Sequence, residues 1–310
     1  MERGAQGAIE YLLIIGAAIL VVAIVILAVT GVLSGGQGNV AGGVTSVQSS
    51  FDAMKETSGN FISLDNKYYM KSSPILSGLA ALWHFDDAQG ATFVDSSGNG
   101  FNAVCDPGHC PLRANGLWGP AYEFGSTTHS ALNDGNHIYV NAPAGSKLDF
   151  GKNDFTISLW FNTRDIPTEP TKADTIFSKG ISDQAGVYGR FWCWIDLGYL
   201  TCRANSDSYN NVTPVTLYFG SFNKNEWYKL VFVREGASIS LYKNGSLVDS
   251  KPLPVGFDST INNPHPLRMG AEGRQGYIFN GYIDEVAIWS RALSAAEVNQ
   301  LYTGALSAGK

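Results

Sequence analysis

From residue 79 onward the chain is a succession of short runs in which apolar and polar residues alternate, separated by Gly, Asn, Asp and Pro. In "FTISLWFN" four apolar residues fall on one face of a strand, namely Phe155, Ile157, Leu159 and Phe161. The stretch "EWYKLVFVREGASISLYKNGSLVDS" predicts successive strands, and its Asn244-Gly245 step is a strong signal for a hairpin turn. Many such runs without helical patterns between them predict a mainly β chain, folded as an antiparallel sandwich or jelly roll.

One helix signal lies near the end of the chain. Ser294-Ala295-Ala296-Glu297 is a capping box, in which a serine and a glutamate satisfy the first free amides of a helix. The box predicts a short helix over "SAAEVNQLY".

A different pattern occupies the start of the chain. Tyr11 to Val29 is a run of 19 residues without a charged or strongly polar side chain. As a helix it would be about 28 Å long, which is close to the thickness of a bilayer core. A cleaved secretory signal is the alternative, because the small residues Ser34-Gly35-Gly36 follow the run, although such signals usually have apolar parts of about 7–15 residues. Glu10, directly before the run, places a charge at the edge of the membrane and so predicts a functional position.

The residues around Glu10 resemble a known signal. Arg3-Gly4-Ala5 followed by Gln6-Gly7-Ala8-Ile9-Glu10-Tyr11-Leu12 resembles the class III signal peptides of archaeal type IV pilin-like proteins. The resemblance implies that a leader peptidase removes residues 1–5 by cutting between Ala5 and Gln6, which makes Glu10 the fifth residue of the mature chain. Glu10 would then pair with the amino terminus of a neighbouring copy when the helices of residues 6–33 assemble into a filament. The alternative is a plain single-pass anchor with Glu10 at the headgroup level.

Residues 34–77 separate this segment from the strand pattern. "SGGQGNVAGGVTSVQSS" is rich in Gly, Ser and Gln and predicts a flexible spacer. From Phe51 to Ser77 the aromatics return without clear periodicity, so this part is expected to be a stalk or an added edge strand.

A second resemblance covers residues 78–304 and leaves 305–310 as a tail. The segments "GLAALWHFDDAQGATFVDSSGNGFNA", "LDFGKNDFTISLWF", "NEWYKLVFVREGASISLYKNGSLV", "PLRMGAEG" and "FNGYIDEVAIWSRALSAAEVNQLY" are similar to laminin-G-like (LamG), concanavalin A-like domains, and they occur in the order of that family. The resemblance implies a jelly roll of two antiparallel sheets with roughly a dozen strands. The fold is used to bind glycans or proteins, but it does not by itself define a function.

The chain has four cysteines, and proximity favours the pairs Cys105–Cys110 and Cys193–Cys202. If Leu197-Gly198 forms a two-residue turn, Cys193 falls opposite Cys202 at a non-hydrogen-bonded pair, within disulfide distance. Disulfides are typical of proteins outside the membrane. The alternative for "CDPGHC" is a zinc site that includes His109, but the segment lacks a local fourth ligand.

The same register places Trp192, Trp194 and Arg203 on the opposite face of this hairpin. Two adjacent indoles beside a guanidinium would form a platform for stacking sugars if they are exposed. The alternative is that they are covered, since tryptophans are usually largely buried.

A structural calcium ion is a further expectation. Asp95, Ser97 and Asn99 in "DSSGNG" offer oxygen ligands at alternate positions around a glycine turn. The resemblance to LamG domains implies help from Asp284 on the last strand, together with Asp86 or Asp87. Ordinary turn chemistry explains the same residues equally well.

Charge and motifs limit the remaining functions. The net charge is −6 and the Lys and Arg residues are scattered, so no nucleic-acid partner is expected. No nucleophile, zinc-protease or P-loop motif is present. Asp284 and Glu285 are adjacent in "YIDEVAIW", and strict alternation would place them on opposite faces, which argues against a glycosidase pair on this strand. Asn211 and Asn244 begin N-glycosylation sequons, as in an exported domain.

Together these patterns predict a pilin-like cell-surface protein that is anchored in the membrane or assembled into an extracellular filament and displays a LamG-like domain for adhesion or for binding a surface glycan or protein. The first alternative is an anchored lectin-like adhesin that never polymerises. The second is a surface glycoside hydrolase.

Overall fold

The computed structural model describes residues 61–65, 67–70, 73–117, 119–125, 136–143, 145–150, 153–168, 173–180, 190–205, 214–255, 257, 266–272 and 277–303. The predicted leader with Ala5 and Gln6, Glu10, the predicted helix over 6–33 and the tail 305–310 lie outside these residues. So does the sequon at Asn211. Within the described part of the chain, no helix is long and apolar enough to cross a membrane.

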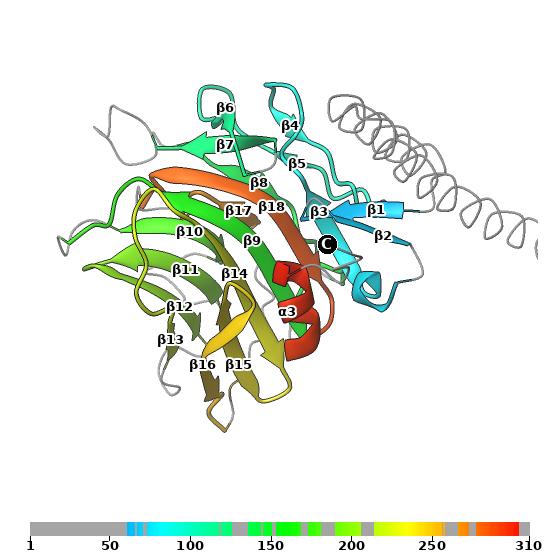
Figure 1. Cartoon of the computed structure of the whole chain (residues 1–310), viewed down its shortest axis with the longest axis vertical. Coiled ribbons are helices and arrows are strands. Elements are labelled where there is room, and N and C mark those ends of the chain that lie inside the picture. Colours follow the sequence, from blue (N-terminus) through cyan, green and yellow to red (C-terminus); the bar gives the residue numbers. More distant parts are fainter. Residues whose placement is uncertain are drawn as a thin grey trace, which may run out of the picture. The chain divides into compact units, whose positions relative to one another are not determined.

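Two antiparallel sheets form the body of the fold (Figure 1). Sheet I has the order β13 (Val215–Tyr218), β12 (Tyr199–Asn205), β11 (Arg190–Asp196), β10 (Asp174–Lys179), β17 (Leu267–Met269), β8 (Ile138–Val140), β5 (Ala103–Val104), β4 (Thr92–Phe93). Sheet II has the order β16 (Ser246–Pro252), β15 (Ser238–Lys243), β14 (Trp227–Glu235), β9 (Phe155–Thr163), β18 (Gly281–Trp289), β7 (Pro120–Phe124), β6 (Leu112–Asn115), and β3 (Leu79–Trp83) also pairs with β18. This confirms the predicted two-sheet, mainly β fold.

The main core lies between the two sheets and is built from alternate residues of their strands. On β9 these are the residues that the sequence predicts, Phe155, Ile157, Leu159 and Phe161, all at most 1% exposed. The aromatic rings interlock across the core; Phe155, for example, stacks on Phe150 at 4.2 Å and meets Phe191 of sheet I edge-on at 4.8 Å. The alternating pattern therefore folds as a sandwich because each sheet buries one face against the other.

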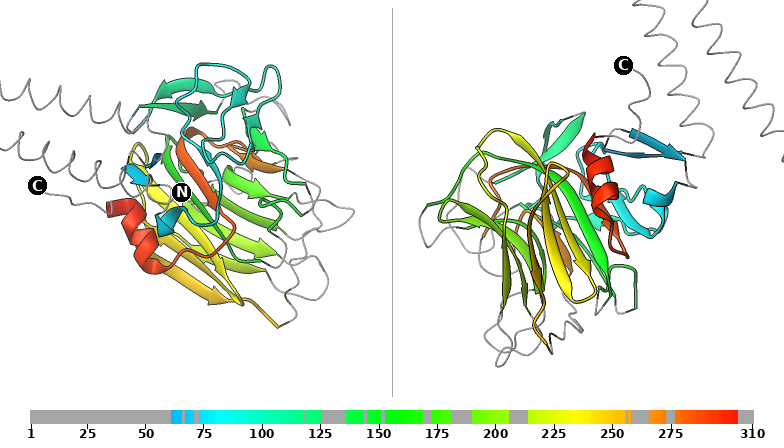
Figure 2. Two further views of the ribbon diagram at one scale, coloured as in Figure 1. Left: turned by 90° about the vertical axis from the view of Figure 1, so that its right-hand side faces the viewer. Right: turned by 60° about the horizontal axis from the view of Figure 1, so that its bottom comes forward.

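A second core covers the outer side of sheet II. Here the helix α3 (Ala295–Thr303), the 3-10 helix η1 (Pro74–Leu76) and the small sheet of β1 (Phe61–Leu64) and β2 (Lys67–Met70) add a third layer, which Figure 2 shows beside sheet II. Its buried side chains include Leu64, Ile75, Trp289, Val298 and Leu301. Residues 62–77, which the sequence assigns to spacer and stalk, are thus part of the same compact unit as the sandwich.

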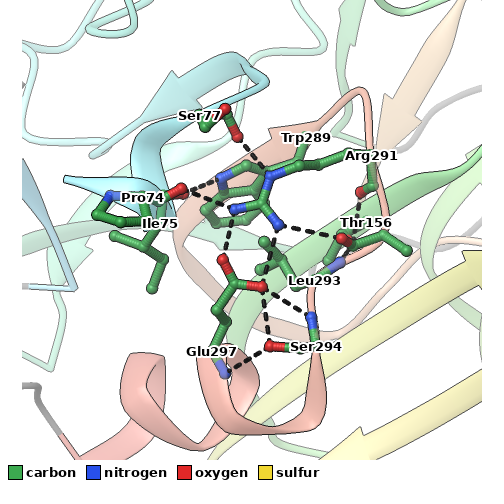
Figure 3. A network of polar contacts seen from close by, with 10 residues as sticks. Pro74, Ile75, Ser77, Thr156, Trp289, Arg291, Leu293, Ser294 and Glu297 are labelled. Carbon is green, nitrogen blue, oxygen red and sulfur yellow. Dashed lines mark hydrogen bonds and ion pairs between the residues drawn. The ribbon is translucent and has the colours of Figure 1, made fainter. Parts of the chain in front are cut away.

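A network of polar contacts fastens this layer (Figure 3). The predicted capping box is present, because Glu297 Oε2 accepts the Ser294 amide at 2.8 Å and the Glu297 amide donates to Ser294 Oγ at 3.3 Å. The Arg291 guanidinium binds both carboxylate oxygens of Glu297 and donates to the carbonyl of Pro74 at 2.9 Å and, through Nε, to that of Ser77 at 2.6 Å. One arginine thereby joins the start of α3 to η1.

Strand β18 departs from strict alternation. A bulge lies between Asp284 and Ala287, and Glu285 has a φ of 48°. Asp284 lies opposite Trp160 of β9, while Glu285 contacts the third layer through the Asp65 amide. The prediction that these two carboxyl groups lie on opposite faces is therefore wrong, because the extra residue of the bulge turns both toward the outer side of sheet II.

Candidate ligand-binding face

The hairpin β11–β12 has the register that the sequence predicts. Asp196 lies opposite Tyr199 around the turn, and Cys193 lies opposite Cys202 with their Cα atoms 4.1 Å apart in a disulfide. The second disulfide joins Cys105 and Cys110, whose Cα atoms are 5.1 Å apart. Both predicted pairings are confirmed, and they leave no thiols for a zinc site.

The residues that alternate with Cys193 and Cys202 point away from the main core. The rings of Trp192 and Trp194 stack at 4.8 Å, and the Arg203 guanidinium lies over both rings, at 5.2 and 5.0 Å from their centroids. Arg203 Nε also donates to Thr216 Oγ1 at 2.9 Å. The two indoles are only 5% and 9% exposed, so this stack is covered rather than open. Burial lowers the pKa of Arg203, while Asp196 raises it by less.

Exposed aromatic side chains lie beside this stack. We define the aromatic face as the outer side of strands β10 to β13, formed by Ser178, Trp192, Trp194, Tyr199, Thr201, Arg203, Thr216 and Tyr218. On it, Tyr199 and Tyr218 are 64% and 53% exposed. Tyr218 lies opposite Thr201, two residues along β12 from Tyr199, so the two phenols are diagonal neighbours.

A shallow groove of about 450 Å³ adjoins Tyr218, where the edge strand of sheet I meets the edge strand of sheet II. It is lined by Pro214, Val215, Thr216, Tyr218, Lys251, Pro252 and Pro254. Lys251 Nζ lies 5.1 Å from the centre of the Tyr218 ring and donates to the Thr216 carbonyl at 2.5 Å. Asp249 Oδ2 accepts the Tyr218 amide at 2.9 Å. The groove thus combines an aromatic ring with a cation, a mixture that suits a polar ligand with an apolar face.

Three buried polar atoms on the same side of sheet I lack hydrogen-bond partners among the described residues. They are Thr201 Oγ1, Asn205 Oδ1 and Arg268 Nη1. Arg268 lies opposite Ser178, which lies opposite Trp192, so these atoms share the face of the tryptophan stack. Buried polar groups are normally paired, so these atoms are expected to bind ordered water.

The expected calcium ligands form hydrogen bonds with protein groups, and calcium binding stays a prediction. Asp95 Oδ1 accepts the amides of Leu82 and Ser97 at 3.0 and 2.9 Å, and its Oδ2 accepts the Phe101 amide at 2.9 Å. Asn99 Oδ1 accepts a hydrogen bond from Lys147 Nζ at 2.6 Å. These contacts are the turn chemistry that the sequence offered as the alternative.

Asp284 lies elsewhere, with its carboxylate accepting the amides of Leu117 and Glu285 at 3.3 and 2.9 Å. Burial, with the neighbouring Glu285 charge, raises the pKa of Asp284 to about 8. Among the described residues, no cluster of three or more His, Cys, Asp or Glu side chains is arranged to hold a metal.

Of the two sequons, only the one at Asn244 lies among the described residues. It forms the β15–β16 turn with Gly245, as predicted, and its Oδ1 accepts the Lys229 amide at 2.8 Å. Its glycosylation stays a prediction.

The family is identified by comparing the sequence with models of known protein families. Residues 134–299 match the Laminin_G_3 family of the concanavalin A-like lectin/glucanases superfamily, which is more than half of the chain. The chain belongs to this family. The match covers β8 to β18, which come from both sheets, and it supports a LamG carbohydrate-binding or adhesion domain.

Solved structures of the same fold include several toxin domains. The binding domain of Paraclostridial Mosquitocidal Protein 1 is 19% identical, with a TM-score of 0.57, and the match covers 74% of this chain and 52% of that one. The binding domain of botulinum neurotoxin DC, solved in complex with SialylT, is 15% identical with a TM-score of 0.55 over 75% of this chain and 53% of that one. At such identities the likeness shows the fold alone, and the LamG chain spans about half of each solved chain.

A curated relative comes from Danio rerio. Adhesion G-protein coupled receptor V1 is 24% identical over 159 residues, which is 48% of this chain and 2% of the receptor. The chain therefore matches a small part of a much larger adhesion protein.

Sequence reasoning missed Tyr199, Tyr218, Asp249 and Lys251. The alternation in "VTLY" places Tyr218 on the outer side of a strand, and that was the available signal. Strands β16 and β13 belong to two different sheets, and no local sequence pattern predicts that they lie close together.

Proposed function

We propose that this protein is a cell-surface binding protein whose LamG domain recognises a glycan at the tyrosine pair and groove of the aromatic face. The observation that carries the proposal is the pair Tyr199 and Tyr218, each more than half exposed on one sheet face, with a groove lined by Tyr218 and Lys251. Sugar rings have apolar faces that stack on phenols and hydroxyls that bond to charged groups, so both halves of the site would be used.

The covered stack beside the tyrosines supports this assignment. Trp192, Trp194 and Arg203 form a rigid backing, and rigid elements hold a binding site more precisely than loops do. Thr201, which lies opposite Tyr218 in the register, is buried together with this stack.

The test is binding of the full chain, in detergent, to a panel of immobilised polysaccharides and oligosaccharides. We expect binding to at least one glycan, and we expect Tyr218→Ala to weaken it about 5- to 30-fold, as for the loss of about 1–2 kcal/mol. Leu112→Ala is the matched control, because Leu112 is 60% exposed on the edge strand β6 of sheet II. Equal binding by wild type and Tyr218→Ala would show that the glycan does not bind at Tyr218. Binding to proteins but to no glycan would show that the ligand is a protein.

We further propose that the N-terminal segment anchors the domain and assembles it into a filament, as the pilin-like motif around Glu10 indicates. The mass of the N-terminal peptide from the native host tests processing, and a chain that begins at Gln6 is expected. Glu10→Ala is expected to abolish filaments and leave membrane insertion intact; filaments that survive the change would favour the non-polymerising adhesin.

Binding without hydrolysis is the proposed activity. The alternative of a surface glycoside hydrolase predicts that the chain releases reducing sugars from a polysaccharide that it binds, and measurable release would overturn the binding-only assignment.

A further inference from the structure

A group of charged residues is buried on the outer side of sheet II, far from the aromatic face. Lys229 is on β14, an inner strand of that sheet, and Asp65 follows β1 in the third layer. Lys229 Nζ lies 2.6 Å from Asp65 Oδ1, and both side chains are 0% exposed. Two residues separated by 164 positions are thus in direct contact inside the protein.

This pair is enclosed on several sides. Trp160 Nε1 donates to the same Asp65 Oδ1 at 3.0 Å, and Lys229 Nζ lies 5.5 Å from the centre of the Trp160 ring. The other oxygen, Asp65 Oδ2, is buried without a hydrogen-bond partner among the described residues. A fully buried ion pair with an unsatisfied oxygen contributes little to stability, because desolvation of the two charges offsets most of their attraction.

A second carboxyl group touches the pair. Glu285 Oε2 accepts the Asp65 amide at 3.2 Å, and both Glu285 oxygens lie within 3.1 Å of His84 Nδ1. Burial lowers the pKa of His84, but the hydrogen bond and charge of Glu285 raise it by more, so the imidazole titrates above its usual value. The His84 side chain is 18% exposed and links the buried group to solvent.

The backbone is held in an unusual conformation at both acidic residues. Asp65 has a φ of 50° and Glu285 a φ of 48°, in the left-handed region that non-glycine residues rarely adopt. Such strain persists where the surrounding structure fixes it, and it is found most often at sites of function.

We propose that Lys229 and Asp65 become joined by an intramolecular amide bond, with Glu285 as the neighbouring residue that positions Asp65 by accepting its backbone amide. The inference goes beyond the proposed glycan binding and does not depend on it. It explains why a lysine, an aspartate and a glutamate converge in a dry site: a neutral amide removes both buried charges.

The reaction balances without a co-reactant. A proton passes from the ammonium to the carboxylate, which leaves a neutral amine facing a neutral acid. Lys229 Nζ then attacks Asp65 Cγ, a C–N bond forms, and the C–Oδ2 bond breaks as that oxygen leaves in a water molecule. The ammonium and carboxylate become an amide and one water, with no oxidation and no net change of charge.

The geometry favours each step. Near-attack arrangements hold reacting atoms about 3–3.5 Å apart, and Nζ already lies 2.6 Å from one oxygen of the carboxyl group it would attack. The Trp160 N–H on Oδ1 stabilises the negative charge that this oxygen gains during attack. Exclusion of water from a fully buried site opposes hydrolysis of the product.

The test is the mass of the full chain, purified, denatured and with its disulfides reduced. It is compared with the mass calculated from the sequence, starting at the residue found at the N-terminus of the purified chain. The amide predicts a deficit of about 18 Da, one water lost in bond formation, and after digestion one cross-linked peptide that contains both Asp65 and Lys229. A mass without this deficit would overturn the proposal. A deficit that maps to other residues would also overturn it.

Variants separate the bond from a merely structural ion pair. Lys229→Arg keeps the positive charge but is expected to show the full mass. Glu285→Ala removes the acceptor of the Asp65 amide. It is expected to fold, as judged by near-ultraviolet circular dichroism, and to show a mostly full mass; an unchanged deficit in this variant would show that Glu285 does not position Asp65. Glycan binding is measured in parallel on the wild type, so the failure of one proposal is distinguishable from the failure of the other.

Discussion

Asp174 is a buried carboxyl group whose protonation should govern the pH dependence of stability. It starts β10, is 8% exposed, and its Oδ2 accepts the Asn280 amide at 3.2 Å. Burial raises its pKa to about 7, while that hydrogen bond lowers it by less. The folded protein therefore holds a proton that the unfolded chain releases near pH 4, and the stability that this proton confers is lost as pH rises from about 4 through 7.

Asp174→Asn removes this titration and keeps an oxygen for the Asn280 amide. We expect the variant to be more stable than the wild type at pH 8 by on the order of 2–4 kcal/mol and to show a flatter pH profile. Urea unfolding between pH 4 and pH 8 measures both. Parallel profiles for the two proteins would show that Asp174 is ionised in the folded state.

At the level of elements, α3 and η1 depend on contacts that reach beyond the helix. Ser294→Ala removes the cap and should lower the free energy of unfolding by about 1 kcal/mol. Arg291→Lys should lower it more, by about 2–4 kcal/mol, because an ammonium group cannot bind Glu297, Pro74 and Ser77 together as the guanidinium does. Urea unfolding of the two single variants measures the difference; a larger loss for Ser294→Ala would contradict the central role of Arg291.

The elements also show where sequence reasoning succeeds. The Asn244-Gly245 turn, the Ser294–Glu297 box and the Cys193–Cys202 pair were predictable, because each depends on residues within about ten positions of one another, where turn geometry and strand alternation fix the outcome. The β18 bulge was not, since one extra residue places Asp284 and Glu285 on the same face, where alternation assigns them to opposite faces.

The candidate site was predictable only in part, for the same reason. Alternation separates Trp192 and Trp194 from the core, but their burial depends on what covers the sheet. The contacts of Lys251 with Tyr218, and of Lys229 with Asp65, join distant strands through tertiary packing. No spacing in the sequence encodes them.

At the scale of the whole molecule, the two disulfides should differ in importance. Both close short loops, for which chain entropy alone predicts about 2–3 kcal/mol each. Cys193 and Cys202 are 0% exposed in the main core, whereas Cys110 is partly exposed. We expect the Cys193→Ala/Cys202→Ala variant to lose more stability than Cys105→Ala/Cys110→Ala, because it also leaves a cavity in the core.

Thermal unfolding of the two double variants, each with the other disulfide intact, measures this difference. Because one pair lies in the connection between β5 and β6 and the other joins β11 to β12, their effects should add in the quadruple variant. Equal losses in the two double variants would mean that the core relaxes around the missing sulfur atoms.

The third layer and the aromatic face lie on opposite sides of the double sheet. Residues 61–64 join the domain on the outer side of sheet II, while Tyr199 and Tyr218 occupy the outer side of sheet I. The side on which β1 joins the sandwich is consequently opposite to the side of the proposed binding face. Many copies carried on one support would then face the same target, and weak single contacts would add up to tight attachment through a high local concentration of sites.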